Sequence, residues 1–241
     1  MPNQYSVGDK IYVPSSFFGD MGAPYAIIER DVLAVQNRSV TVEYKGKRKR
    51  VGTKLVHSSV STIIFRIGDY GSEHTSLNPL SKSFLQYLRL LLEDPLIRLY
   101  EIRTKTEFDT IWKTEHGGFS NVVLIGHGNE SKGLRFGNDW VSVDDLVSSF
   151  NLPGVSAKNV FSLCCKTGKG AFARPVSSAD FCKCLVAPMN TCPVAAASDF
   201  VQSLFTFHFL VGKGIKASFN NAKKAAIPGP NFRYWQNGKL S

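Results

Sequence analysis

The sequence predicts a three-layer α/β/α fold with a mostly parallel sheet, preceded by a small all-β barrel. From residue 62 to residue 226, short apolar runs alternate with segments whose apolar residues recur at helical spacing. Such runs are typical of buried parallel strands, and the intervening helices then cover both faces of the sheet. Before residue 58 the chain instead shows short alternating segments, frequent turn residues and no helical spacing.

Composition places the chain among ordinary globular proteins. It has 241 residues, of which 43% are hydrophobic and 20% are charged, so it can bury a proper core. We expect a cytoplasmic protein without a membrane span, because the N-terminus lacks a basic leader with an apolar core and no apolar run approaches the roughly 20 residues that cross a bilayer. The net charge of +10 favours an acidic partner or non-specific nucleic-acid binding, although the basic residues are spread along the chain.

Residues 1–57 are predicted to form a separate domain. The stretches "VGDKIYV" and "SVTVEYKGKRKRV" resemble an SH3-like or Tudor-like barrel. A turn that passes into a strand is expected at 7–14, and further strands at 25–29, 32–35, 39–44 and 50–56. Modules of that kind usually bind a peptide or another part of their own chain. The basic run at 45–50 is either a phosphate-binding surface or a solvated hairpin.

Residues 58–241 are predicted to form the α/β domain. Strands are expected at 62–67, 97–102, 122–125, 160–163 and 184–187, and helices at 82–93, 107–112, 143–150, 195–211 and 215–226. Ser81 is the expected N-cap of the first helix, and Asp94-Pro95 is expected to end it. The aromatic residues Phe232, Tyr234 and Trp235 are candidate anchors of the C-terminal tail.

Two of the predicted strands end in chemically reactive residues. The run at 122–125 stops at Gly126-His127-Gly128, and the run at 160–163 stops at Cys164-Cys165. Since parallel strands end at the same edge of a sheet, we expect His127 and a cysteine to share one crevice. A histidine that takes the proton of a thiol is the minimum machinery of a cysteine nucleophile. Backbone N–H groups of Gly128 and of the cysteine could then stabilise an oxyanion.

These strand ends also resemble a known family. "NVVLIGHGNESKGLRFGNDWVSVDDLVSSF" followed by "NVFSLCCKTGKG" is similar to the caspase-like cysteine peptidases, and within them to the CHAT and separase-type branch, whose relatives occur in bacterial defence. The resemblance extends over residues 60–226, but only the two strand ends are specific. In that family a Cys-x-Thr-Gly motif carries the nucleophile, and Cys165-Lys166-Thr167-Gly168 matches it.

The resemblance implies a mechanism. Cys165 would attack a peptide bond and form a thioester acyl-enzyme, with His127 as general base and then acid. Gly128 and Cys165 would supply the oxyanion hole, while Cys164 takes a small-residue position whose contribution stays open. The family needs no cofactor and no carboxylate as a third member. A peptidase of this kind needs control, so we expect a regulatory protein, a small-molecule activator or proximity to switch it on.

Substrate specificity is the open part of this prediction. Asp69 and Glu73 follow the first strand of the α/β domain, where they would form an acidic pocket wall that selects a basic residue, or else be solvated loop charges. Met189 and Asn190, the other candidate substrate-binding residues, lie in a loop without the acidic residue that some relatives place there.

Two alternatives compete with the peptidase. The five cysteines, Cys164, Cys165, Cys182, Cys184 and Cys192, together with His127, could hold zinc, but their spacing differs from that of structural zinc sites. Disulfides are disfavoured in a chain without a secretion signal. The other alternative is a catalytically silent, caspase-shaped interaction module with a basic face.

Overall fold

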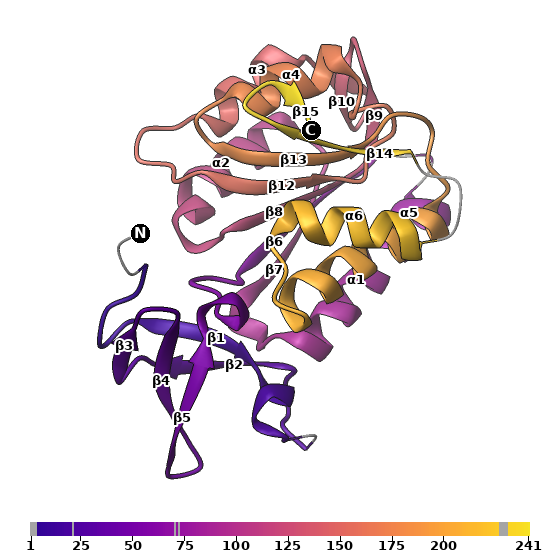
Figure 1. Ribbon diagram of the computed structural model, residues 1–241. Coiled ribbons are helices and arrows are strands. Elements are labelled where there is room, and N and C mark those ends of the chain that lie inside the picture. The colour runs from indigo at the N-terminus through magenta and orange to yellow at the C-terminus, as the bar shows by residue number, and fades with distance from the viewer. Residues whose placement is uncertain (1–3, 21, 70, 72, 227–230) are drawn as a thin grey trace.

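A seven-stranded sheet organises most of the chain (Figure 1). The computed structural model describes residues 4–20, 22–69, 71, 73–226 and 231–241. In spatial order the strands are β15 (Lys239–Leu240), β14 (Phe232–Gln236), β13 (Cys182–Pro188), β12 (Lys158–Ser162), β8 (Asn121–Ile125), β6 (Thr62–Ile67) and β7 (Ile97–Ile102). From β13 to β7 all neighbours are parallel, whereas β14 and β15 run antiparallel.

Helices cover both faces of this sheet, so the predicted α/β/α fold with a mostly parallel sheet is confirmed. One layer consists of α1 (Asn78–Leu91), α5 (Val194–Phe205) and α6 (Ile215–Ala225). The opposite layer consists of α2 (Lys105–Glu115), α3 (Val143–Phe150) and α4 (Gly170–Ser178). Side chains of β8 alternate between the two apolar clusters, which explains why that strand is continuously hydrophobic.

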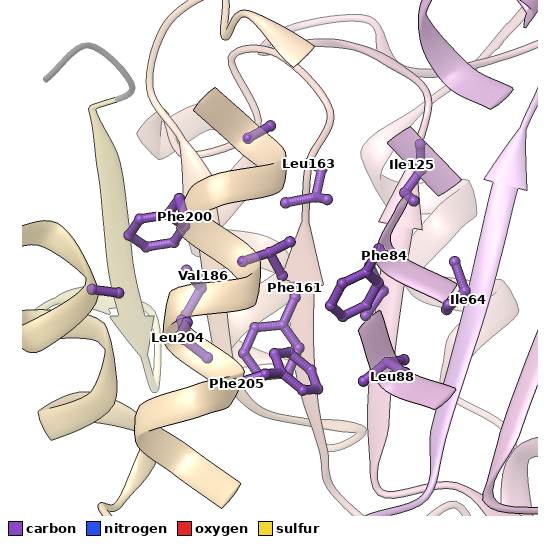
Figure 2. Close-up of a cluster of buried hydrophobic side chains, with 14 of the residues drawn as sticks. Ile64, Phe84, Leu88, Ile125, Phe161, Leu163, Val186, Phe200, Leu204 and Phe205 are labelled. Atoms are coloured by element: carbon purple, nitrogen blue, oxygen red, sulfur yellow. The ribbon is translucent and has the colours of Figure 1, made fainter. Parts of the chain in front are cut away.

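Aromatic packing joins each helical layer to the sheet. Figure 2 shows Phe84 of α1, Phe161 of β12 and Phe205 of α5 in one buried cluster. The ring of Phe205 lies 5.1 Å from that of Phe84 and 5.0 Å from that of Phe161. Aromatic pairs of this kind add about 0.5–1.5 kcal/mol each beyond the area they bury. On the other face, the ring of Phe65 of β6 lies 4.8 Å from that of Phe108 of α2, in an edge-to-face arrangement.

The order of the strands creates a switch point between β6 and β8. From β6 the chain passes through α1 to the edge strand β7, and it returns through α2, on the opposite face, to β8. The next strands, β12 and β13, continue away from β7. In open α/β sheets the crevice outside the carboxyl ends of such strands is where ligands bind. The fold therefore directs attention to the residues that follow β6, β8 and β12.

Several helix ends differ from the sequence prediction: α2, expected at 107–112, spans Lys105–Glu115, and the largest differences are in α1 and α5. Helix α1 starts at Asn78 and not after Ser81, because a wide π turn, η3 (Glu73–Leu77), leads into it and Pro79 occupies its first turn. Ser81 is buried inside the helix, where its hydroxyl donates to the carbonyl of Asn78 at 3.1 Å, so its predicted N-cap role is wrong. The long helix predicted at 195–211 ends at Phe205 and continues as a π turn, η6 (Thr206–Leu210).

Several elements have no counterpart in the sequence prediction. A small antiparallel sheet follows β8 and contains β9 (His127–Asn129), β10 (Gly133–Phe136) and β11 (Asp139–Val141). Helix α4 connects β12 to β13. The tail forms β14, which buries Phe232, Tyr234 and Trp235, the three predicted anchors. Short 3₁₀ turns complete the described elements: η1 (Ser15–Phe18), η2 (Thr53–Leu55), η4 (Asp94–Leu96) and η5 (His116–Gly118).

The N-terminal segment, residues 4–20 and 22–57, forms two small antiparallel sheets. One pairs β1 (Lys10–Pro14) with β2 (Ile27–Asp31), and the other joins β3 (Ala34–Gln36), β4 (Ser39–Tyr44) and β5 (Lys47–Gly52). A separate cluster of buried apolar side chains, mostly valines, lies between them. Positive φ angles of 50° at Lys45 and 73° at Gly46 make the tight β4–β5 turn. The SH3-like barrel and the domain boundary after residue 57 stay predictions.

The N-terminal segment packs against the end of the α5 layer. The ring of His57 lies 4.9 Å from the ring of His208, and its Nε2 lies 3.3 Å from the carbonyl oxygen of Phe209. Nearby, a Cβ on Gly212 would come within 2.5 Å of the carbonyl oxygen of Lys54, so only glycine allows this approach. Within the described part of the chain, no helix has both the length and the apolar character to span a bilayer.

Candidate active site

Three chemically reactive side chains follow three neighbouring parallel strands. Asp69 is two residues beyond β6, His127 two residues beyond β8, and Cys165 three residues beyond β12. Because β6, β8 and β12 are adjacent and parallel, these residues leave the sheet at the same edge. The structure therefore brings His127 and Cys165 to one edge, with Asp69 on the other side of the switch point between β6 and β8.

A carboxylate holds the imidazole of His127. Oδ2 of Asp69 lies 3.1 Å from Nε2 of His127, and the side chain of Asp69 is only 6% exposed whereas that of His127 is 38% exposed. Arg135, which faces His127 across the β9–β10 ladder, approaches the same carboxylate oxygen at 3.5 Å. A buried carboxylate that contacts one ring nitrogen selects the tautomer and the orientation of that ring. Asp69 thus faces the histidine, a contact that the sequence prediction did not include.

Gly128 places the histidine loop directly against the cysteine loop. A Cβ at this position would lie 2.6 Å from the carbonyl oxygen of Cys165, 2.7 Å from Cγ2 of Thr167 and 2.9 Å from Cβ of Cys164. Those distances are far below ordinary van der Waals contact, so only glycine fits. The second glycine of the Gly-His-Gly pattern therefore allows the loop after β8 to pack directly against the loop after β12.

The turn that carries Cys165 is held by side-chain hydrogen bonds. The hydroxyl of Thr167 donates to the carbonyl of Cys164 at 2.7 Å, and it lies 2.7 Å from the hydroxyl of Ser162. Lys166 has a φ of 64°, a left-handed conformation that is strained for a residue with a side chain. The left-handed residue of this turn is thus Lys166, next to Cys165. Strain that the surroundings hold in place is common beside reacting groups.

Burial separates the two adjacent cysteines. Cys164 is fully buried, and this burial raises the pKa of its thiol to about 12. Cys165 is half-buried, and its Sγ accepts a hydrogen bond from the backbone N–H of Cys192 at 3.5 Å. The exposure pattern therefore favours Cys165 over Cys164 as a nucleophile, independently of any motif.

Glycine 128 and Cys165, the expected oxyanion-hole residues, are adjacent through this packing. Gly128 lies in β9 opposite Leu134 of β10, and its Cα position faces the carbonyl of Cys165. Their roles as N–H donors to a substrate stay a prediction.

Met189 and Asn190 follow β13 and flank the cysteine turn. The carbonyl of Asn190 accepts a hydrogen bond from the N–H of Lys166 at 3.3 Å. The sulfur of Met189 lies 2.9 Å from Nε of Arg233, which belongs to β14. The loop after β13 therefore borders the residue next to Cys165, as a wall of a substrate crevice would.

Glu73 has its carboxylate occupied by arginines. It is buried, and its two oxygens accept hydrogen bonds from Arg103 at 2.7 Å and 2.6 Å, while Arg66 lies 3.2 Å away. Hydrogen bonds from Arg103, and then the contact with Arg66, lower the pKa of Glu73. Its negative charge is therefore balanced by arginines of the chain itself, and the carboxylate packs against Gly68.

The remaining predicted binding features lie elsewhere. The basic run from Lys45 to Arg50 is exposed on the β4–β5 hairpin of the N-terminal segment. All five cysteines are free thiols. Among the residues that the structure describes, no group of three or more histidine, cysteine or acidic side chains is arranged to hold a metal ion.

Comparisons with known proteins identify a fold likeness only. No protein-family model matches the chain, and no curated protein matches it. Among solved structures, one similar chain is the X-ray structure of an inactive zymogen C11 protease from Parabacteroides distasonis, at 10% sequence identity and a TM-score of 0.44. The match covers 73% of this chain and 61% of that one, so this chain spans less than two thirds of its length. The CHAT and separase-type resemblance stays a prediction.

Proposed function

We propose that this chain is a cysteine peptidase that hydrolyses peptide bonds through Cys165 and His127, with Asp69 as the residue that positions the histidine. The observation that supports this proposal is the placement of the three side chains after β6, β8 and β12, with the Asp69–His127 contact at 3.1 Å. A nucleophile and a base are the minimum parts of a thiol hydrolase, and a carboxylate that orients the base completes a triad.

Each residue has a defined role in the proposed reaction. Since Nε2 of His127 faces Asp69, Nδ1 is the ring nitrogen that takes the proton of Cys165. The thiolate attacks the peptide carbonyl, and the N–H groups of Gly128 and Cys165 stabilise the oxyanion. One such donor is worth about 3 kcal/mol in the transition state. His127 then protonates the leaving amine, and water hydrolyses the thioester.

The surroundings bear on which peptide would bind. Asp69 contacts His127 and Arg135, and Glu73 is paired with Arg103 and Arg66, so both carboxylates are matched by groups of the chain itself. This arrangement therefore does not favour selection of a basic substrate residue by Asp69 and Glu73. Met189 and Asn190 remain the proposed contacts for the side chain that precedes the cleaved bond.

A positional-scanning peptide library tests the proposal. We expect the wild-type protein to cleave after a restricted set of residues, and Cys165→Ala and His127→Ala to lose activity. Asp69→Asn should keep the fold but lose roughly 10²- to 10⁴-fold in kcat/KM, because an amide no longer holds the imidazole in the required tautomer. A positioning role should also change the pH dependence of kcat/KM, which a purely structural role would not.

Two control variants separate the dyad from general damage. His116→Ala removes a histidine of η5, which precedes β8 and so lies at the other end of that strand from His127. Cys184→Ala removes a cysteine near the start of β13. Both controls should retain activity. Equal loss in controls and dyad variants, or undiminished cleavage by Cys165→Ala, would rule out the proposed mechanism.

A further inference from the structure

We propose that Cys165 is an oxidation site for peroxides and that Cys192 resolves the oxidised cysteine as a reversible Cys165–Cys192 disulfide. The effect on activity rests on the proposed peptidase function, whereas the disulfide itself depends only on the two thiols. The disulfide would switch the peptidase off reversibly and would protect Cys165 from irreversible oxidation.

The two residues are held beside each other by the loops after β12 and β13. The backbone N of Cys192 lies 3.5 Å from Sγ of Cys165. Since an N–Cα bond is about 1.46 Å long, Cα of Cys192 lies within about 5 Å of that sulfur. Two backbone hydrogen bonds, Lys166 N–H to Asn190 O at 3.3 Å and Gly168 N–H to Pro188 O at 2.8 Å, tie the same loops together. A disulfide could therefore close by side-chain rotation and a small loop shift.

Both thiols are accessible, and the other cysteines are excluded as partners by geometry. Cys165 and Cys192 are half-buried, whereas Cys164, Cys182 and Cys184 are buried. Cys182 and Cys184 align with the start of β12, at the other end of the strand from Cys165. A bond between Cys164 and Cys165 is disfavoured, because adjacent Cα atoms are about 3.8 Å apart and disulfides span about 4.4–6.8 Å.

Burial distinguishes the two thiols further. Burial, and then the neighbouring Cys165, raise the pKa of Cys192 to about 12, so Cys192 is a thiol at neutral pH. Cys165 is therefore the sulfur that reacts with peroxide first, and this sulfur receives a hydrogen bond from the N–H of Cys192.

The chemistry balances with hydrogen peroxide as the oxidant. The thiolate of Cys165 attacks one peroxide oxygen, the O–O bond breaks, and sulfenic acid and hydroxide form. The sulfur of Cys192 then attacks the sulfenic sulfur, the S–O bond breaks, and water leaves with the thiol proton. The two sulfurs together lose two electrons, and the peroxide gains them. Without a resolving thiol, further peroxide converts the sulfenic acid irreversibly to sulfinic acid.

Peptide mapping of the full chain under non-reducing conditions tests the proposal. Trypsin cleaves after Lys158, Lys166, Lys183 and Lys213, so Cys165 falls in peptide 159–166 and Cys192 in peptide 184–213. After treatment with hydrogen peroxide, we expect these two peptides to be joined, with loss of two hydrogen atoms. Fragment ions should place the bond at Cys165 and Cys192. Because this measurement uses the wild-type protein, it does not depend on whether a variant folds.

Matched variants distinguish the cysteines within each peptide. The link should persist in Cys164→Ser and Cys184→Ser and should be absent from Cys192→Ser, in which Cys165 should instead accumulate as sulfinic acid. A wild-type protein that forms only sulfinic acid, or a link that survives in Cys192→Ser, would overturn the proposal.

Activity measurements keep this proposal separate from the peptidase proposal. Dithiothreitol should restore at least tenfold more activity to peroxide-treated wild type than to peroxide-treated Cys192→Ser. If no peptide is cleaved under any condition but the link forms, the peptidase proposal fails and the oxidation site stands. If cleavage occurs and no link forms, the oxidation site is refuted and the peptidase stands.

Discussion

Gly128→Ala gives the most direct test of how the two loops of the site are joined. The added methyl group would meet the Cys165 carbonyl oxygen at 2.6 Å, Thr167 at 2.7 Å and Cys164 at 2.9 Å. Carbon atoms make favourable contacts at about 3.5–4.0 Å, so the overlap approaches 1 Å at each contact. One of these neighbours is a backbone carbonyl, which cannot rotate away. The loop after β12 must therefore move as a whole.

The expected cost follows from that overlap. Inserting a methyl group into a packed site costs about 1–3 kcal/mol. With a value of about 2 kcal/mol and an m-value of about 2 kcal/mol per molar urea, the unfolding midpoint should fall by about 1 M. Moving Cys165 by a distance of about 1 Å should also lower kcat/KM by roughly 10²-fold.

Urea denaturation and peptide cleavage measure the two effects on the same sample. Gly118→Ala is the matched control, because a Cβ there has nothing within 4 Å, and its unfolding free energy should stay within about 0.5 kcal/mol of wild type. Gly126→Ala, with its nearest atoms at 3.0 Å, should fall between the two. If Gly128→Ala unfolds at the same urea concentration as Gly118→Ala, the close approach of the two loops is refuted.

Three further predictions concern buried charges and thiols. Glu73→Gln should destabilise the fold by about 3 kcal/mol at neutral pH, because it removes the buried carboxylate beside Arg66 and leaves the half-exposed Glu101 to balance that buried charge. The pKa of Glu73 is lowered in the fold, so its contribution is complete above the unfolded value and the difference in urea midpoint should shrink as the pH falls below about 4. Burial, and then the neighbouring His57, lower the pKa of His208 from 6.5 to about 4. Because the unfolded chain then binds the proton more readily, the free energy of unfolding should fall by about 3 kcal/mol as the pH drops from 6.5 to 4. His208→Asn should flatten that pH dependence in urea titrations. Iodoacetamide at neutral pH should modify Cys165 first in intact-mass kinetics, and equally fast modification of the buried thiols would refute the assigned exposure.

The sequence predicts those parts of the fold that depend on local pattern. The helix expected at 143–150 is found as α3 with the same bounds, because a serine cap and an apolar face define it locally. Helix α4 escapes prediction because it contains Pro175 and mostly small residues. The sheet that starts at β9 escapes because its strands are short and its first strand reads His-Gly-Asn.

The candidate site shows a similar division. That His127 and Cys165 follow two apolar runs is visible in the sequence, and parallel pairing predicts their shared edge. The contact between Asp69 and His127 is not visible, because it depends on β6 lying next to β8 although β7 separates them along the chain. The sequence does show a carboxylate, Asp69, just after a buried strand, but it does not show which strands are neighbours in the sheet.

The position of the N-terminal segment limits how it can affect the site. His57 lies beside the starts of the parallel strands, since a cavity of about 720 Å³ there is lined by residues that include His57, Ser120, Asn159 and Lys183. Cys165 lies beyond the opposite ends of those strands, which are five or six residues long and so span about 15–20 Å. Direct delivery of a substrate by this segment is therefore disfavoured by distance.

One physical connection between the two regions does exist. Helix α5 begins two residues after Cys192, beside the site, and its continuation η6 ends against His57 through His208 and Phe209. Deleting residues 1–57 would remove His57 and uncover the rings of His208 and Phe209, so lost activity after deletion would reflect lost stability as readily as lost regulation. His208→Asn changes the same interface while keeping the segment in place. A change in the alkylation rate of Cys165 in that variant would show that α5 transmits the state of the interface, and an unchanged rate would assign the N-terminal segment a structural role.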